Sequence, residues 1–208
     1  MGTFSDLQTN IANDLTRNDL GSQIKSAIGD AVKFYETSRF WFNTTRSKTF
    51  QTKATQAAYD GDDLAEIPNI IRIEKLYLRD GVSIYPLDWY EPDEFEFLTG
   101  LNASGRPTIY TYVDSQILMY PTPVAGNTIR PHMHYRLAPL AQDTDSNAWC
   151  NEAENLIRAH AKLILYTNVI EDDEGAQRMQ AEIPALKSKL DYETSARSAT
   201  GRIRGSDF

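Results

Sequence analysis

The stretch that is most informative about the fold class is IPNIIRIEKLYLRDGVSIYPLDW, residues 67–89. Apolar and polar residues alternate along its first half, which is the two-residue period of a half-buried strand. The two faces of this strand are expected to carry Ile71, Ile73 and Tyr77 on one side and Arg72, Glu74 and Leu76 on the other. The Arg79–Gly81 turn then leads into Val82 and Ile84, so the stretch predicts a β-hairpin.

More strand signals follow this hairpin. A second hairpin is predicted from Ile109 to Met119, with its turn at Asp114 and Ser115. A further strand covers residues 128–136, and Pro131 inside it predicts an edge strand or a bulge. Between the hairpins, residues 89–98 read as a short helix with Pro92 in the first turn. Residues 48–138 therefore predict an inserted, antiparallel, all-β lobe.

Helical periodicity brackets this lobe on both sides. Apolar residues recur every three or four positions in residues 4–15 and 20–35, and again in 147–165 and 176–190. We expect Ser5 and Gln8 to form a capping box, and Pro184 to kink or divide the last helix. The class is α+β: a helical bundle from residues 1–47 and 139–194, with the β lobe inserted and an extended tail after it.

Residues 195–208, SARSATGRIRGSDF, are too poor in apolar residues to order themselves, and by count they carry about +2. The rest of the chain then carries about −10, because the net charge is −8. A basic tail on an acidic body can bind a neighbouring subunit, or it can be an inert terminus. The aromatic cluster at residues 34–42 is open between a partner-binding patch and core at the junction of the two lobes.

Composition excludes several classes of protein. No apolar run is long enough to span a bilayer, and residues 1–10 lack the features of a secretory signal. The only cysteine is Cys150, so no disulfide can form within the chain, which suits a reducing compartment. The acidic balance disfavours a sequence-independent nucleic-acid clamp. We expect a soluble protein that is made in a cytoplasm and does not contact a membrane.

Few residues suggest chemistry. His132 and His134 have zinc-ligand spacing, but Arg130 and Arg136 share their predicted face and would repel a cation, so a solvated or partner-facing basic strand is favoured. Asp143, Asp145, Asn147 and Glu154 match places in a calcium loop, but Ala148 stands where glycine is needed, and capping by Ser146 or Asn147 is the simpler interpretation. Cys150 reads as a buried apolar residue. We predict no catalytic residues, no metal and no cofactor.

Four stretches together resemble the head-to-tail adaptor, or connector, proteins of short-tailed bacteriophages. They are FYETSRFWFN at residues 34–43 with TFQT at 49–52, IPNIIRIEKLYLRDG at 67–81 with YPLDWYEPDEFEFL at 85–98, SGRPTIYTYVDSQILMYPTP at 104–123, and NAWCNEAENLIRAHAKLILYTNVI at 147–170 with GRIR at 201–204. They cover most of the chain in the expected order. One departure is YDGDDLAEIP at residues 59–68, where a compact YDLP-type turn is expected.

This resemblance implies a structural virion protein at the head–tail junction, assembled in the cytoplasm of the host bacterium, and not an enzyme. It implies a ring of twelve subunits beneath the portal protein, which extends the channel for DNA without binding it specifically and provides a platform for the tail nozzle. The residues expected to bind the portal are Arg197, Arg202, Ile203, Arg204 and Phe208. The partner-facing strand is expected to be Arg130, His132, His134 and Arg136, which would meet a neighbouring subunit or the next tail component.

Two functions of other classes remain open at this point. One is an enzyme with an assembled carboxylate site, for example around Glu171–Glu174. The other is a nucleic-acid-binding module that uses the Arg130–Arg136 strand.

Overall fold

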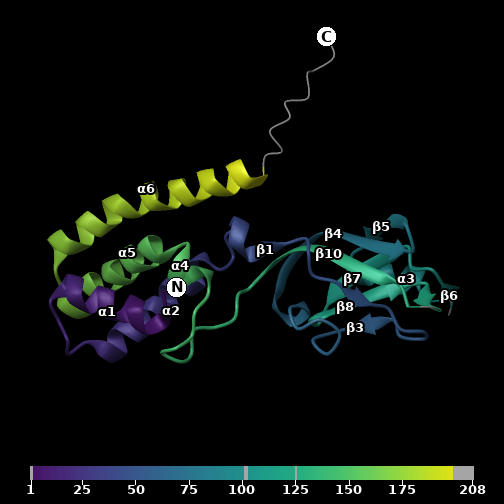
Figure 1. Ribbon diagram of the computed structural model, residues 1–208, viewed down its shortest axis with the longest axis horizontal. Helices are drawn as coiled ribbons and strands as arrows, with labels where there is room; N and C mark the ends of the chain where they lie inside the picture. Colours follow the sequence, from purple (N-terminus) through teal and green to yellow (C-terminus); the bar gives the residue numbers. More distant parts are fainter. Residues whose placement is uncertain (1, 101–102, 125, 199–208) are drawn as a thin grey trace, which may run out of the picture. The chain divides into compact units, whose positions relative to one another are not determined.

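The structure is a computed structural model that describes residues 2–100, 103–124 and 126–198 (Figure 1). The chain forms two compact units: Met1–Asn43 with Leu137–Phe208, and Thr44–Arg136. We call these the helical unit and the β unit. The predicted mixed α+β class is confirmed. Within the described ranges, no helix is both long and apolar enough to cross a membrane.

The helical unit is built from the two ends of the chain. Its elements are α1 (Phe4–Leu15), α2 (Gly21–Tyr35), η1 (Trp41–Asn43), α4 (Ala148–Asn151), α5 (Glu154–Leu165), the π-turn η3 (Tyr166–Ile170) and α6 (Asp173–Ser198). In this unit α5 packs against α1, α2 and α6, so a helix from the second half of the sequence holds those of the first half together.

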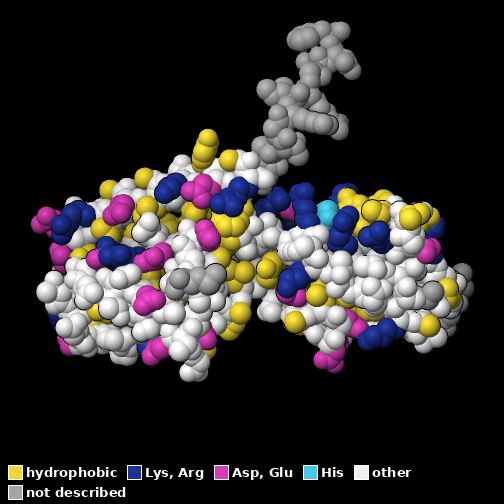
Figure 2. Space-filling view, in the orientation of Figure 1, with side chains coloured by type: hydrophobic (Ala, Val, Ile, Leu, Met, Phe, Trp, Pro, Cys, Tyr) yellow, Lys and Arg dark blue, Asp and Glu magenta, His cyan; other side chains and the backbone are white. Residues whose placement is uncertain are grey.

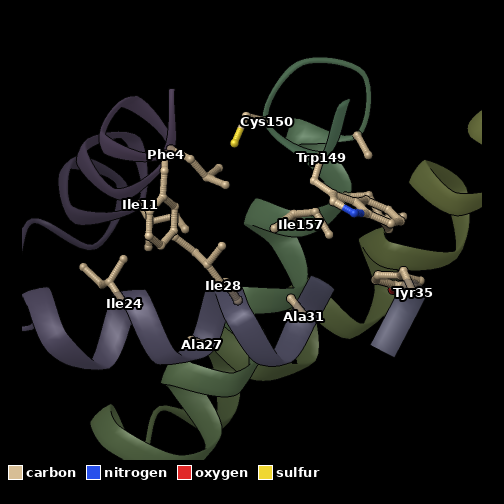
Figure 3. Close-up of a cluster of buried hydrophobic side chains, with 14 of the residues drawn as sticks. Phe4, Ile11, Ile24, Ala27, Ile28, Ala31, Tyr35, Trp149, Cys150 and Ile157 are labelled. Atoms are coloured by element: carbon tan, nitrogen blue, oxygen red, sulfur yellow. The ribbon is translucent and has the colours of Figure 1, made fainter. Parts of the chain in front are cut away.

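One apolar core joins these helices (Figure 3). Ile11 from α1, Ile28 from α2 and Ile157 from α5 are completely buried and point into the same interior. Within the aromatic cluster, the Phe40 and Phe42 rings lie 6.0 and 5.1 Å from the ring of Trp149. These two phenylalanines therefore belong to the core of the helical unit, whereas Phe34 is 65% exposed.

Two local expectations about the helices were wrong. The capping box of α1 is Thr3 with Asp6, two residues earlier than Ser5 with Gln8, because Phe4 is already helical and buried. Pro184 does not divide α6, which runs on to Ser198, beyond the expected end at residue 194. Pro184 and Gln180 are both exposed, so water can hydrate the carbonyl that proline leaves without a donor.

The described residues of the β unit form ten strands, one 3₁₀-helix and one α-helix. They are β1 (Thr44–Thr45), β2 (Phe50–Gln51), β3 (Ala58–Tyr59), η2 (Ile67–Asn69), β4 (Ile70–Asp80), β5 (Ser83–Trp89), α3 (Pro92–Leu98), β6 (Ser104–Gly105), β7 (Ile109–Val113), β8 (Gln116–Tyr120), β9 (Thr122–Pro123) and β10 (Thr128–Tyr135). The main sheet has the order β1-β10-β4-β5-β7-β8-β3, and β2 also pairs with β10. The unit is not wholly antiparallel, since β5 with β7 and β6 with β9 are parallel pairs.

Both predicted hairpins are present. Gly81 closes the β4–β5 turn with φ of +58°, a left-handed conformation that glycine adopts without strain. Asp114 and Ser115 have φ of 50° and 59° in the β7–β8 turn, the pattern of a two-residue type I′ hairpin. These turns set the register of the strands on either side.

The alternation predicted for β4 fails halfway along the strand. The pairing of β4 with β10 shifts register between His132 and Met133, opposite the step from Lys75 to Ile73. This bulge reverses the alternation, so Leu76 and Leu78 are buried and Tyr77 lies on the more open face. Pro131 is in line with its prediction, because a bulge follows it and the β1 and β2 pairings leave it out.

A capping substitution tests the start of α1. Thr3→Ala removes the side-chain oxygen that accepts from the Asp6 N–H, so it should lower the free energy of unfolding by about 1 kcal/mol. Ser5→Ala is the matched control and should change it by less than about 0.5 kcal/mol. Urea unfolding followed by circular dichroism measures both. Equal losses in the two variants would contradict the observed cap.

A second prediction concerns Asp14, which links α1 to α5. It accepts hydrogen bonds from Arg158 and, at 2.8 Å, from the Lys162 Nζ. The hydrogen bond from Arg158 is the main reason that the pKa of Asp14 lies below its usual value. Asp14→Asn should therefore cost about 1–2 kcal/mol at neutral pH.

This cost depends on pH in a defined direction. The stabilisation is complete above the unfolded-state pKa of aspartate and is lost as the pH falls through the lowered folded-state pKa. The unfolding curves of the wild type and of Asp14→Asn should thus converge in acid. Asp30→Asn is the control, because Asp30 is exposed and lies 3.9 Å from Lys33. A difference between wild type and Asp14→Asn that is constant with pH would contradict the assignment.

Candidate partner-binding site: a basic groove on the β unit

A groove of about 220 Å³ lies on one face of the β unit. It is lined by a loop and three strands: Arg46, Ser47 and Thr49 between β1 and β2, Tyr77 and Arg79 on β4, Ile84 on β5, and Thr128 and Arg130 on β10. We call this surface the basic groove. On the face shown in Figure 2, Lys and Arg side chains of the β unit lie close to a histidine, with hydrophobic side chains beside them.

Strand register explains why these side chains meet. Arg130 is directly opposite Tyr77 and Thr128 is opposite Arg79, while Arg79 is also opposite Ile84 on the other neighbouring strand. Residues that are paired across strands, or two apart along a strand, share one face of a sheet. Because the bulge in β4 lies before Tyr77, it determines that Tyr77 and Arg79 are on the groove face.

The basic groove has an excess of positive charge. The Arg130 guanidinium lies 5.7 Å from the centre of the Tyr77 ring. The centre of the His132 ring lies 4.8 Å from the centre of the same Tyr77 ring. Burial is the main reason that the pKa of His132 is lowered; the charges of Arg46 and Arg130 lower it further, and Glu74 acts in the opposite direction. His132 is therefore neutral at neutral pH, and the arginines supply the charge.

The arginines of the groove are not neutralised in the way that two lysines of the unit are. Lys48 and Lys53 form ion pairs of 2.6 Å with Glu66 and Asp63. By contrast, the ion pairs of the described residues include none with Arg46, Arg79 or Arg130, although the Arg79 Nε donates to the Gly81 carbonyl. Guanidinium and hydroxyl groups around an aromatic ring can bind carboxylates or phosphates, but they offer no nucleophile with a base.

The structure separates the four residues of the predicted partner-facing strand. Arg130 lines the basic groove and His132 lies beside it. His134 is only 5% exposed, so it does not share their accessible face. The reason is the pair of register shifts on either side of Met133 and His134, which interrupts the alternation of β10. Arg136 is exposed just beyond the end of β10.

Arg46, Tyr77 and Arg79 were missed by the sequence interpretation. Each stands in a polar or alternating stretch that is typical of many exposed strands and loops. The signal that identifies them is the pairing of β4 with β10, which joins residues 49 or more positions apart. No local pattern in the sequence records that pairing.

The side chains of the predicted calcium loop form hydrogen bonds with separate groups of the same chain and do not converge. Asp143 accepts from Lys25 and Gln8, Asp145 accepts from the backbone of Ala141 and Gln142, and Glu154 accepts from Asn10. The Asn147 side chain accepts from the Trp149 N–H and caps α4, so the capping interpretation is correct. In the described part of the chain, no three His, Cys, Asp or Glu side chains are grouped as metal ligands are.

The other candidate chemical groups have structural roles. Cys150 is buried, and burial raises the pKa of its thiol, which makes it a poor nucleophile. In the Glu171–Glu174 stretch, Glu171 has a left-handed backbone that ends η3, and Asp172 accepts from the Gly175 N–H at the start of α6. These acidic residues thus form the turn between two helices.

The C-terminal end of α6 is attached to the helical unit through Trp41. The Arg197 guanidinium lies 3.7 Å from the centre of the Trp41 ring. The backbone N–H of Trp41 donates a hydrogen bond to the Thr194 Oγ1 at 3.2 Å. Arg197, expected as a portal-binding residue, therefore contacts its own chain. Arg202, Ile203, Arg204 and Phe208 lie outside the described residues.

The comparison with known proteins identifies the family of this chain. A family model described as SU10 adaptor protein matches residues 2–205, which covers residues of both units. No curated protein matches the sequence. The family match confirms the resemblance to phage head-to-tail adaptors and implies a structural role in the virion. The chain belongs to the SU10 adaptor protein family and is a structural adaptor protein of a bacteriophage.

Proposed function

We propose that this chain is one subunit of a twelve-membered adaptor ring that docks beneath the portal, extends the DNA channel and provides the platform for the tail nozzle. The observation that carries the proposal is the family match over residues 2–205, because it includes both units and most of the C-terminal segment. The helices from the two chain ends serve as one bundle that supports this segment.

The charge distribution supports passage of DNA through the ring. The net charge of −8 opposes binding of phosphates to most of the surface, so DNA can slide past without being held. A nucleic-acid-binding module would need its basic residues to dominate the surface. Here Arg46, Arg79 and Arg130 gather at one groove, which suits a short anionic segment of a protein.

The C-terminal segment is the proposed contact with the portal. Its helical beginning is fixed to the body by the stacking of Arg197 on Trp41, so the basic residues that follow start from a defined point. Restricting where a binding segment begins raises its effective concentration at a neighbouring surface. Arg202 and Arg204 would then bind acidic groups of the portal.

Deleting residues 199–208 tests the docking proposal. The truncated protein should fold with an unchanged melting temperature but fail to bind purified portal rings in sedimentation or cryo-electron microscopy. Replacing Arg202 and Arg204 by glutamate should have the same effect, and Arg178→Glu with Lys189→Glu, two exposed positions on α6, is the matched control. Normal docking of the truncated chain to portals would sink the proposed role of the tail.

The stacking of Arg197 on Trp41 gives a separate prediction. Arg197→Ala removes a cation–π contact of about 1 kcal/mol, so amide hydrogen exchange in residues 194–198 should accelerate by roughly fivefold. Arg178→Ala, elsewhere on α6, should leave this exchange unchanged. Identical exchange in Arg197→Ala and wild type would show that the contact does not hold the end of α6.

A further inference from the structure

A second surface of the β unit has the opposite character to the basic groove. The segment Trp89–Leu98 covers the end of β5 and helix α3, and its sequence is WYEPDEFEFL. Four of its carboxylates are exposed: Glu91, Asp93, Glu94 and Glu96. Trp89 and Phe97 are 55% and 88% exposed, so apolar surface lies among these charges. We call this surface the acidic segment.

Neither surface is neutralised within the described chain. The ion pairs of the described residues include none of the four carboxylates of the acidic segment, just as they include none of the three groove arginines. The groove also has apolar surface at its edge, because Val82 and Ile84 of the β4–β5 hairpin are 94% and 49% exposed. Charge and apolar surface are therefore complementary between the two.

The geometry of β5 keeps the two surfaces apart in one molecule. Ile84, near the start of β5, lines the basic groove, whereas Trp89 at the end of β5 begins the acidic segment. Five residues of extended chain separate their Cα atoms by about 17 Å, roughly twice the Debye length at physiological ionic strength. Only the last two residues of β5 pair with β7, against which α3 packs, so α3 lies beyond the far end of β5.

We propose that the acidic segment of one copy binds in the basic groove of the next copy, as a lateral contact of the ring. Glu91, Asp93, Glu94 and Glu96 would face Arg46, Arg79 and Arg130, while Phe97 and Trp89 cover Val82 and Ile84. A contact between two different surfaces of the same chain is heterologous, and repetition of such a contact forms a ring when the rotation between copies closes. The inference rests on the proposed function and assigns the surfaces by which its subunits associate.

A second copy suits the groove better than other anionic partners. Every subunit of a ring presents both surfaces at the same concentration, and each surface leaves charges without a partner in the described residues. DNA phosphates would match the guanidinium groups but not the exposed Val82 and Ile84. A tail protein could supply acidic residues, but it would leave Phe97, 88% exposed, and the four carboxylates of this chain unexplained.

Two charge-reversed variants test this contact. Variant A carries Arg46→Glu, Arg79→Glu and Arg130→Glu; variant B carries Glu91→Lys, Asp93→Lys, Glu94→Lys and Glu96→Lys. Each variant alone should place like charges together at every lateral contact. The concentration needed to fill a portal ring should rise more than about 100-fold, because such juxtaposition costs several kcal/mol.

An equal mixture of A and B should assemble again. In an alternating ring, the acidic groove of A meets the basic segment of B, and the native groove of B meets the native segment of A. We expect half-filling within about threefold of the wild-type concentration, measured by native mass spectrometry of adaptor on purified portal. The control carries Lys33→Glu, Arg178→Glu and Lys189→Glu, which match the charge change of A at exposed positions of the helical unit. It should fill the ring by itself, and it should not rescue B.

Several outcomes would overturn the proposal. Normal ring filling by A alone, or no rescue in the mixture of folded A and B, would show that these surfaces do not meet. Normal filling by A with loss of the next tail component would assign the groove to the tail nozzle instead. Loss of DNA binding by free A, relative to wild type, would assign the groove to nucleic acid.

Folding and docking are read separately from the lateral contact. Circular dichroism melting curves show whether A is folded, and a milder variant with only Arg46→Glu and Arg130→Glu replaces it if the loss of the Arg79 bond to Gly81 unfolds the hairpin. If wild-type protein does not bind portal at all, the proposed function fails. If single subunits of A bind portal through the tail but do not fill the ring cooperatively, the lateral contact alone is lost, as we expect.

Discussion

The two ends of the chain bury one shared apolar core, and this requirement constrains the remainder of the fold. α1 and α2 each have a single apolar face, and α5 from the second half of the sequence covers both. The chain must therefore return to the helical unit after residue 136. Pairing of β1 with β10 satisfies this requirement, because it places the first and last strands of the β unit side by side.

The bulge between β4 and β10 has a comparable role inside the β unit. It allows Ile73 and Met133 to be partners and, a few residues later, Leu76 and Leu78 to be buried. The cost is one irregular step in the ladder; the consequence is that Tyr77 and Arg79 lie on the same face as Arg130. A structural irregularity thus creates a basic surface on an acidic protein.

The charges of the protein are separated in space more than its composition suggests. Asp14, Asp143 and Asp63 are each paired with a cation and stabilise contacts within their own unit. The carboxylates of α3 and the arginines of the groove have no such partners among the described residues. Charges that do not stabilise the fold of a single chain are available for recognition between chains, where opposite potentials select the partner and the orientation.

Local patterns in the sequence predicted the α+β class, both hairpins and the helices at both ends of the chain. The resemblance to phage adaptors was also recognisable from the sequence alone. These features depend on local periodicity, on turn residues such as Gly81 and on the order of recognisable stretches. The capping box of α1 was assigned to the wrong residues because Thr3 and Ser5 are equivalent as caps until Phe4 is seen to be helical and buried. The predicted alternation of β4 was wrong beyond Lys75 because the bulge in its pairing with β10 reverses which residues are buried.

The residues of the basic groove could be identified only from the tertiary structure. Arg46, Tyr77 and Arg130 are distant in sequence, and their meeting depends on strand register and on one bulge. The same pairing buries His134, which the alternation of β10 had placed with Arg130. Register is set by the packing of a whole sheet against its core, so a sequence read in local windows predicts strands but not which side chains they bring together.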